Sequence, residues 1–270
     1  MRSSLMALSL ILAAACSGGD HLSPSVVNSG TPDIVDNASF ESGWDDFTNG
    51  GGVPPTGHTR DQAQAYDGAM GVKRVLAPGA ETGGAFHYPF YFPWAPYQNT
   101  TKDHLWTRFY FYIDAPFDGI LKLQLFNTDD GVDLGGLFLN SGSIGWVPVE
   151  WLYAGGTIYN LVPIDNLVNG WHSLEVDFWR NGDPSGFSSA AIWLDTTQIT
   201  HADGPIAESG SANGYWADNR IYTGVRDTGH TGTHGIGDVY WTGIKNAGST
   251  VAANIWVDRI AISSVGPIGP

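Results

Sequence analysis

The chain has 270 residues and a formal net charge of −15 at pH 7. This length suits one large domain or two small ones, and the acidity disfavours nucleic acid as a partner because phosphates would be repelled. Only 14% of the residues are charged, whereas there are 36 Gly and 11 Trp. That composition excludes a disordered chain and indicates an all-β protein with many turns.

Residues 1–15 have the layout of a secretory signal peptide. Arg2 gives a short basic start, Leu5–Leu12 is apolar, and small residues stand before the expected cleavage site. The apolar run is too short to span a membrane. Cys16, the only cysteine, follows directly, and this spacing resembles a bacterial lipobox. The alternative is an ordinary signal with an incidental cysteine, but an unpaired thiol in an exported protein needs a role. We therefore predict a lipoprotein that meets the membrane only through the lipid on Cys16.

Residues 16–33 read as a tether between this lipid and the folded domain. The segment is rich in Ser, Gly and Pro and has no periodicity, which is typical of a flexible linker. We expect the folded domain to occupy residues 34–270.

The body of the domain alternates apolar and polar residues with the period of a β-strand. The clearest examples are Leu105–Ile113, Ile120–Phe126 and Trp171–Trp179. In the second run Leu121, Leu123 and Leu125 alternate with Lys122 and Gln124. Period-two runs separated by Gly, Asn, Asp and Pro predict half-buried strands of a β-sandwich.

The polar faces of these strands mix flat aromatic rings with planar polar groups, which is the mixture that binds sugars. We predict a concave groove in which four aromatic residues stack on sugar rings and the other groups bond hydroxyls or a carboxylate. The alternative is that long loops cover both faces. The predicted groove residues are Arg108, Tyr110, Tyr112, Lys122, Gln124, Glu175, Asp177, Trp179 and Trp193.

Two ends of the domain resemble known carbohydrate-active jelly rolls. Residues 34–41 (IVDNASFE) are similar to the opening strand of jelly-roll carbohydrate-binding modules, and residues 254–263 (NIWVDRIAIS) to their closing strand. The order of the runs between them resembles concanavalin A-like jelly rolls of the polysaccharide-lyase type, such as alginate and glucuronan lyases. The resemblance implies a single jelly-roll β-sandwich over about residues 34–270.

The same resemblance implies a structural Ca²⁺ ion that joins the first and last strands. Glu41 and Asp258 would be its side-chain ligands, with backbone carbonyls completing the shell of oxygen atoms that this hard ion prefers. The alternative is that Glu41 caps a turn and Asp258 pairs with Arg259 or another cation.

Cleavage by a polysaccharide lyase competes with simple binding. β-Elimination in a polyuronate needs a base and a cation that neutralises the carboxylate. Tyr110, Tyr112, Arg108 and Gln124 are the candidate catalytic residues. We expect Lys122 and Tyr240 to share their face. Histidines such as His58, His87, His104 and His172 are further candidates, although His172 falls on the apolar side of its strand.

Glycoside hydrolysis fits the sequence less well. Glu175 and Asp177 resemble part of the strand motif of laminarinase-like jelly rolls, but Trp179 stands where the acid/base carboxyl is expected. Retaining cleavage needs two carboxyl groups. The leading prediction is therefore an exported protein that recognises a polysaccharide, with a uronate lyase as the alternative. A structural or adhesion protein of the envelope, whose aromatic face is a protein interface, is the third.

Overall fold

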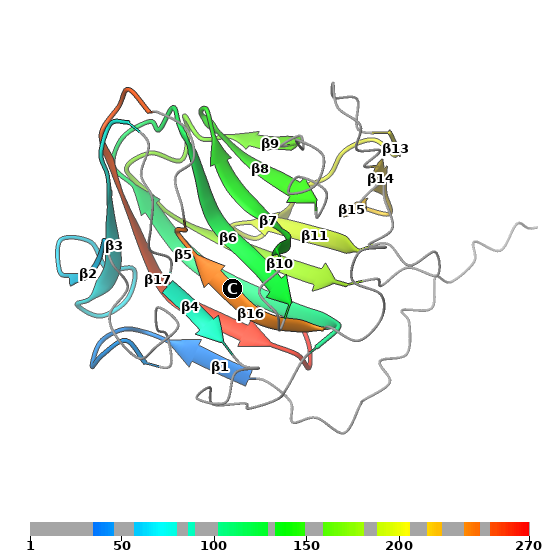
Figure 1. Cartoon of the computed structure of the whole chain (residues 1–270), viewed down its shortest axis with the longest axis horizontal. Helices are drawn as coiled ribbons and strands as arrows, with labels where there is room; N and C mark the ends of the chain where they lie inside the picture. Colours follow the sequence, from blue (N-terminus) through cyan, green and yellow to red (C-terminus); the bar gives the residue numbers. More distant parts are fainter. Residues whose placement is uncertain are drawn as a thin grey trace, which may run out of the picture.

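The computed structural model describes ten segments of the chain, and all of their regular elements are strands. These strands form two antiparallel sheets that pack face to face (Figure 1), which confirms the predicted all-β sandwich. The described part of the chain contains no helix long and apolar enough to cross a membrane. The predicted signal peptide, Cys16 and the tether lie outside the described residues. The described residues are 35–45, 57–79, 86–89, 102–128, 133–148, 159–180, 188–205, 215–222, 235–243 and 249–269.

The larger sheet, sheet A, has eleven strands in the order β13-β14-β15-β11-β10-β5-β17-β3-β2, with β1 beside β17 and β12 beside β11. The first and last strands therefore pair. The strands are β1 (Val35–Ala38), β2 (His58–Asp61), β3 (Gly71–Leu76), β5 (His104–Ile113), β10 (Trp171–Trp179), β11 (Ser189–Leu194), β12 (Thr197–Gln198), β13 (Gly204–Pro205), β14 (Tyr215–Ala217), β15 (Arg220–Tyr222) and β17 (Ala253–Ser263).

The smaller sheet, sheet B, has six strands in the order β4-β16-β6-β7-β8-β9. It lies in front of sheet A in Figure 1. Its strands are β4 (Phe86–Pro89), β6 (Ile120–Thr128), β7 (Asp133–Asn140), β8 (Ser143–Pro148), β9 (Tyr159–Pro163) and β16 (Ile236–Trp241).

The hydrophobic core fills the space between the two sheets, as the alternation predicts. Leu105, Phe109 and Phe111 of β5 are fully buried, and the ring of Phe178 on β10 stacks on Phe126 of sheet B with centroids 4.4 Å apart. Each such side chain stabilises the fold by about 1.5–3 kcal/mol through its removal from water. Because every second residue of β5 points inward, the remaining residues lie on the outer face of sheet A.

Strand β6 departs from the predicted alternation. Its pairing with β7 shifts register between Lys122 and Gln124, the mark of a β-bulge. Beyond the bulge the two faces exchange, because a bulge inserts one extra residue into the strand. Gln124 is fully buried and donates a hydrogen bond of 2.7 Å from its Nε2 to Thr107 Oγ1 in the core. Leu125, predicted to lie with Leu121 and Leu123, belongs to a separate cluster instead.

Candidate functional site

The structure separates the predicted groove residues into three places. Seven of the nine lie on the outer face of sheet A, on strands β5, β10 and β11. Gln124 lies in the core, and Lys122 lies on the outer face of sheet B beside Tyr240. The prediction of one shared face for all nine residues is therefore wrong. The physical reason is that the chain crosses from sheet A to sheet B between β5 and β6.

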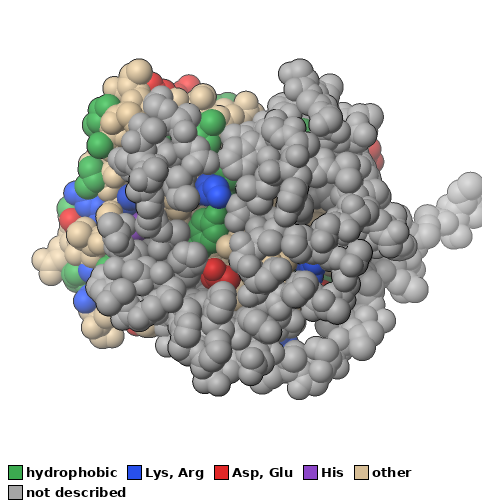
Figure 2. Space-filling model, in the orientation of Figure 1, with side chains coloured by type: hydrophobic (Ala, Val, Ile, Leu, Met, Phe, Trp, Pro, Cys, Tyr) green, Lys and Arg blue, Asp and Glu red, His purple; other side chains and the backbone are tan. Residues whose placement is uncertain are grey.

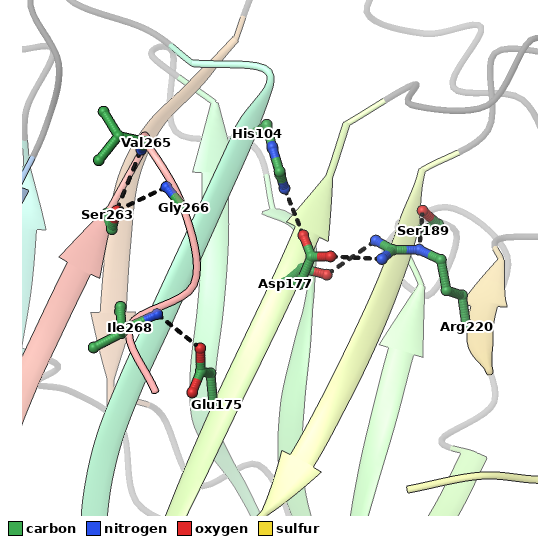
Figure 3. A network of polar contacts seen from close by, with 9 residues as sticks. All are labelled: His104, Glu175, Asp177, Ser189, Arg220, Ser263, Val265, Gly266 and Ile268. Carbon is green, nitrogen blue, oxygen red and sulfur yellow. Dashed lines mark hydrogen bonds and ion pairs between the residues drawn. The ribbon is translucent and has the colours of Figure 1, made fainter. Parts of the chain in front are cut away.

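On the outer face of sheet A, the C-terminal segment of residues 264–269 occupies two of the predicted sugar contacts (Figure 3). The Arg108 guanidinium donates a hydrogen bond to the carbonyl of Gly269. Glu175 Oε1 accepts hydrogen bonds from the backbone N–H groups of Ile268, at 3.0 Å, and Gly269, at 3.4 Å. These two side chains were predicted to bond a sugar, but here they hold the chain's own backbone.

Asp177 and Trp179 belong to a second set of internal contacts on the same face. Asp177 lies between His104 Nε2, at 2.5 Å, and an Arg220 guanidinium nitrogen, at 2.6 Å (Figure 3). The Arg220 Nε also donates to Ser189 Oγ at 3.1 Å. The ring of Trp179 stacks on His104 with centroids 3.5 Å apart. These contacts connect strands β5, β10, β11 and β15, so these side chains stabilise sheet A.

The titration behaviour of this network agrees with a buried ion pair. Burial lowers the pKa of His104 and outweighs the opposing effect of Asp177. Burial opposes ionisation of Asp177, but the hydrogen bond from His104 and the charge of Arg220 prevail and lower its pKa. His104 is therefore neutral and Asp177 ionised near neutral pH. Burial also raises the pKa of Tyr110, with a further contribution from Tyr66.

Removal of residues 266–270 tests the structural role of the C-terminal segment. We expect the truncation to lower the free energy of unfolding by about 2 kcal/mol, because a hydrogen bond to a charged group contributes about 1.5–3 kcal/mol. Urea unfolding measures the change. The matched control is Val265→Ala, which alters an exposed side chain of the same segment and should leave the stability nearly unchanged. Equal stability of the truncated and full chains would contradict this role.

The outer face of sheet B brings together a lysine, a phenol and an apolar floor. Lys122 Nζ lies 5.9 Å from the ring centroid of Tyr240. Tyr240 stands opposite Leu125 in the strand register, and Phe138 stands opposite Lys122. Tyr240, Leu125 and Phe138 form one hydrophobic cluster. Figure 2 views the molecule from this side and shows hydrophobic, basic and acidic side chains together at the centre of the face.

A glycine and two residues of sheet A fix the end of strand β16 beside this pair. A Cβ atom on Gly243 would lie 2.7 Å from Tyr240 Cε2 and 3.4 Å from Lys122 Cβ, so a side chain at this position would force the pair to shift. His58 Nε2 lies 2.6 Å from Thr242 Oγ1. The Arg74 guanidinium donates to the carbonyls of Thr242 and Gly243. The edge of sheet A therefore positions a site on sheet B.

Asp238 and Asn127 follow the same face, because the strand register sets them opposite each other on β16 and β6. The backbone of β4 continues the sheet, with His87 in register with Tyr240. Asp238 and Asn127 are both buried. From the sequence, Lys122 and Tyr240 are expected to share one face with Arg108 and the tyrosines of β5. The two residues do lie together, but on sheet B and apart from the β5 residues. Arg74 and Gly243 are not predictable from the sequence, because no local pattern marks residues that act through a distant strand.

Glu41 and Asp258, the predicted calcium ligands, both hold the segment between β2 and β3. Glu41 accepts hydrogen bonds from the backbone N–H groups of Ala69 and Met70. Asp258 accepts from those of Tyr66, at 2.9 Å, and its neighbour Arg259, at 2.7 Å. The predicted alternative, in which Glu41 caps a turn, therefore describes part of what is seen. The guanidinium of Arg259 pairs with Asp67 rather than with Asp258.

The pair nevertheless has the charge and ligand type that a hard cation prefers. Burial raises the pKa of Asp258 to about 6, and the charge of Glu41 adds to the shift. A cation bound between the two carboxylates would favour the ionised form of Asp258. The described residues hold no group of three or more His, Cys, Asp or Glu that suits a metal, so backbone carbonyls would have to complete the shell.

The raised pKa of Asp258 predicts a pH dependence of stability. The folded state binds this proton more tightly than the unfolded chain, whose ordinary value is 3.8. The stabilisation is therefore complete below pH 3.8 and is lost as the pH rises through about 6. Relative to Asp258→Asn, the wild-type chain should lose about 2 kcal/mol of stability between pH 4 and pH 7 in the presence of a chelator.

Urea unfolding of both chains across this pH range measures the effect. The control is Asp165→Asn, a substitution at an exposed acid, for which the difference from wild type should stay flat. A flat difference for Asp258→Asn as well would show that this carboxyl does not titrate in the range.

Comparisons with known proteins agree with the fold. No protein-family model matches the chain, and no curated protein matches its sequence. The endo-β-1,4-glucuronan lyase of the fungus Trichoderma reesei is similar in structure with a TM-score of 0.51 and 12% identity, over 85% of this chain and 94% of that one. The cellulose-induced protein Cip1 is similar with a TM-score of 0.52 and 16% identity, over 87% and 99%. At such identities the likeness shows the fold alone, the jelly-roll β-sandwich that the sequence predicted.

Proposed function

We propose that the chain binds an acidic polysaccharide on the outer face of sheet B and cleaves it by β-elimination at Tyr240 and Lys122. The observation that carries the proposal is the placement of a phenol and an ammonium group side by side, 5.9 Å from Nζ to ring centroid. The pair comes from the neighbouring strands β16 and β6. The structural likeness to a glucuronan lyase supports this choice of substrate.

The two side chains match the two demands of the reaction. In its ionised form the Tyr240 oxygen takes the proton from the carbon next to the uronate carboxylate. The bond from the adjacent carbon to the glycosidic oxygen then breaks, a carbon–carbon double bond forms, and the neutral phenol returns the proton to the leaving oxygen. Lys122 neutralises the carboxylate while negative charge builds on it.

Lys122 also supplies the local positive charge that the binding of a polyuronate requires. A net charge of −15 repels a polyuronate, so binding requires a local cation. Phe138 stands opposite Lys122 in the register of β7, and Leu125 stands opposite Tyr240. This apolar surround strengthens the attraction between the ammonium group and a carboxylate, because charges interact more strongly where water is excluded.

The test is incubation of the protein with alginate, glucuronan, pectate and a set of neutral polysaccharides. Ultraviolet absorbance reports the unsaturated uronate, and co-sedimentation reports retention. Absorbance that grows on a polyuronate supports the proposal. Retention without absorbance overturns the lyase and leaves a binding protein. Neither signal on any polymer contradicts both functions and favours a structural envelope protein.

We also propose that Ca²⁺ binds at Glu41 and Asp258. When bound, the ion would neutralise the two carboxylates and fasten the segment between β2 and β3 to the closing strand β17. The expected result is a rise in melting temperature when Ca²⁺ is added to chelated protein at pH 7. The rise should disappear in Glu41→Gln and in Asp258→Asn. An equal rise in these variants would place the ion elsewhere.

Export and lipidation complete the proposal. Cleavage before Cys16 and lipidation of its thiol would anchor the domain to a membrane of the cell envelope through the tether of residues 16–33. Expression in a bacterial host with labelled fatty acid tests this. The label should appear on the wild-type chain and be absent from Cys16→Ser. If the wild-type protein is recovered outside the cells and carries no labelled fatty acid, it is secreted in the ordinary way.

A further inference from the structure

A row of side chains crosses four neighbouring strands on the outer face of sheet A. In the register, Lys73 of β3 stands opposite Trp256 of β17, which stands opposite Tyr112 of β5, and Tyr112 stands opposite Trp171 of β10. Lys73 Nζ lies 4.9 Å from the Trp256 ring centroid. The Tyr112 ring centroid lies 5.6 Å from that of Trp256 and 5.8 Å from that of Trp171. Three strand spacings give the row a length of roughly 14 Å.

Tyr66, from the segment between β2 and β3, adds an exposed ring to this row. It stacks on Tyr110 with centroids 3.6 Å apart and an interplanar angle of 15°, and it meets Trp171 edge to face at 5.9 Å. The residue is 45% exposed, which is unusual for a large aromatic side chain among the described residues. Because one ring face lies on Tyr110, the exposed surface belongs to the opposite face and the edge.

The exposed ring is held in place and is not a loose surface residue. The backbone N–H of Tyr66 donates to the buried carboxylate of Asp258 at 2.9 Å, and Tyr110 supports the ring from below. Tyr112 and Trp171 remain half-buried beside it. A ring fixed in advance loses little conformational freedom when a ligand covers it, which favours binding.

We propose that Tyr66, Trp171 and Tyr112, here called the aromatic platform, bind a neutral polysaccharide by stacking against its sugar rings. Apolar ring faces bordered by polar groups suit a sugar, whose C–H faces are apolar and whose rim carries hydroxyls. Asn169 supplies such a polar edge, since its Oδ1 accepts from the Tyr112 hydroxyl at 3.4 Å. This site lies on the opposite sheet from Tyr240 and Lys122 and is independent of the proposed β-elimination.

The charges around the platform favour a neutral polymer over a polyuronate. Lys73 lies 3.9 Å from Asp61, and Arg259 lies 2.9 Å from Asp67, so carboxylates compensate these two cations. A third cation, Arg108, lies 5.5 Å from the Tyr110 ring centroid and donates to the backbone carbonyl of Gly269. The net charge of −15 adds a general repulsion of anions. A protein partner is disfavoured by size, because a stable interface buries about 800 Å² on each partner and the platform offers one exposed ring and two half-buried ones.

Affinity electrophoresis of the whole chain through gels that contain soluble mixed-linkage β-glucan, galactomannan, xylan or alginate tests the proposal. We expect retardation by at least one neutral polymer. Tyr66→Ala should weaken that binding about tenfold, and Tyr66→Phe should retain it. The matched control Val75→Ala removes exposed apolar surface from the neighbouring part of strand β3 and should bind like wild type.

Three results would overturn the proposal. The first is unchanged binding of the neutral polymer by Tyr66→Ala. The second is a result that assigns the binding to sheet B. Binding of alginate alone would do so, and so would binding of a neutral polymer that is lost in Lys122→Met but kept in Tyr66→Ala. The third is the absence of retardation by every neutral polymer. Thermal unfolding of each variant excludes loss of fold as the cause, and loss of uronate cleavage alone would leave the platform unaffected.

Discussion

The variant Tyr240→Phe is expected to lower the rate of uronate β-elimination by about a hundredfold or more. The substitution removes only the phenol oxygen and keeps the ring that packs with Leu125 and Phe138. General acid–base catalysis contributes about 10²–10⁴ to a rate, and in the proposed reaction the same oxygen accepts the proton and returns it. The measurement is the initial rate of ultraviolet absorbance on the polyuronate that the wild-type chain cleaves.

Matched variants on the other sheet distinguish the loss of a catalytic group from a general disturbance of the fold. Tyr112→Phe makes the same change on the outer face of sheet A and should leave the rate unchanged. Lys122→Met should lower the rate strongly. Lys73→Met, which also removes an ammonium group packed on an aromatic ring, at 4.9 Å, should not. If Tyr112→Phe and Tyr240→Phe slow the reaction equally, the site is wrongly placed.

The strands that form the core were predictable because their alternation is local. Strand β5 places Leu105, Phe109 and Phe111 inward, as its sequence indicates, and β10 behaves alike. Strand β6 was not predictable beyond Lys122. A bulge depends on the partner strand, and its effect was to send Gln124 into the core and Leu125 outward. A period-two pattern carries no signal for such an insertion.

The candidate site was only half predictable for a related reason. The residue types of Lys122 and Tyr240 suggest the chemistry, but their meeting depends on β16 pairing with β6, a contact between distant parts of the chain. The contacts of Glu175 on sheet A were not predictable for the opposite reason. The side chain of Glu175 faces outward as predicted, but the backbone N–H groups of Ile268 and Gly269 bind it. No residue near Glu175 in the sequence indicates that the C-terminal segment folds back onto this strand.

Arg220→Ala is expected to cost about 3 kcal/mol of folding free energy at pH 7. The substitution leaves Asp177, which is 8% exposed, without its charged partner at 2.6 Å. Breaking a buried ion pair from one side costs about 3–5 kcal/mol, because the remaining charge stays out of water. The Arg220 side chain is 19% exposed, so solvent screening keeps the loss at the lower end of that range.

The pH dependence of this loss distinguishes an ion pair from simple packing. The lowered pKa of Asp177 means that its stabilisation is present above the ordinary value of 3.8 and is lost as the pH falls below it. The difference between wild type and Arg220→Ala, measured by urea unfolding, should therefore shrink below pH 4. Arg259→Ala is the control, because its pair with Asp67 is 37% and 57% exposed and should contribute less than about 1 kcal/mol. A pH-independent loss for Arg220→Ala would mean that the arginine stabilises β15 through its hydrocarbon stem, and the network of Figure 3 would then be packing rather than electrostatics.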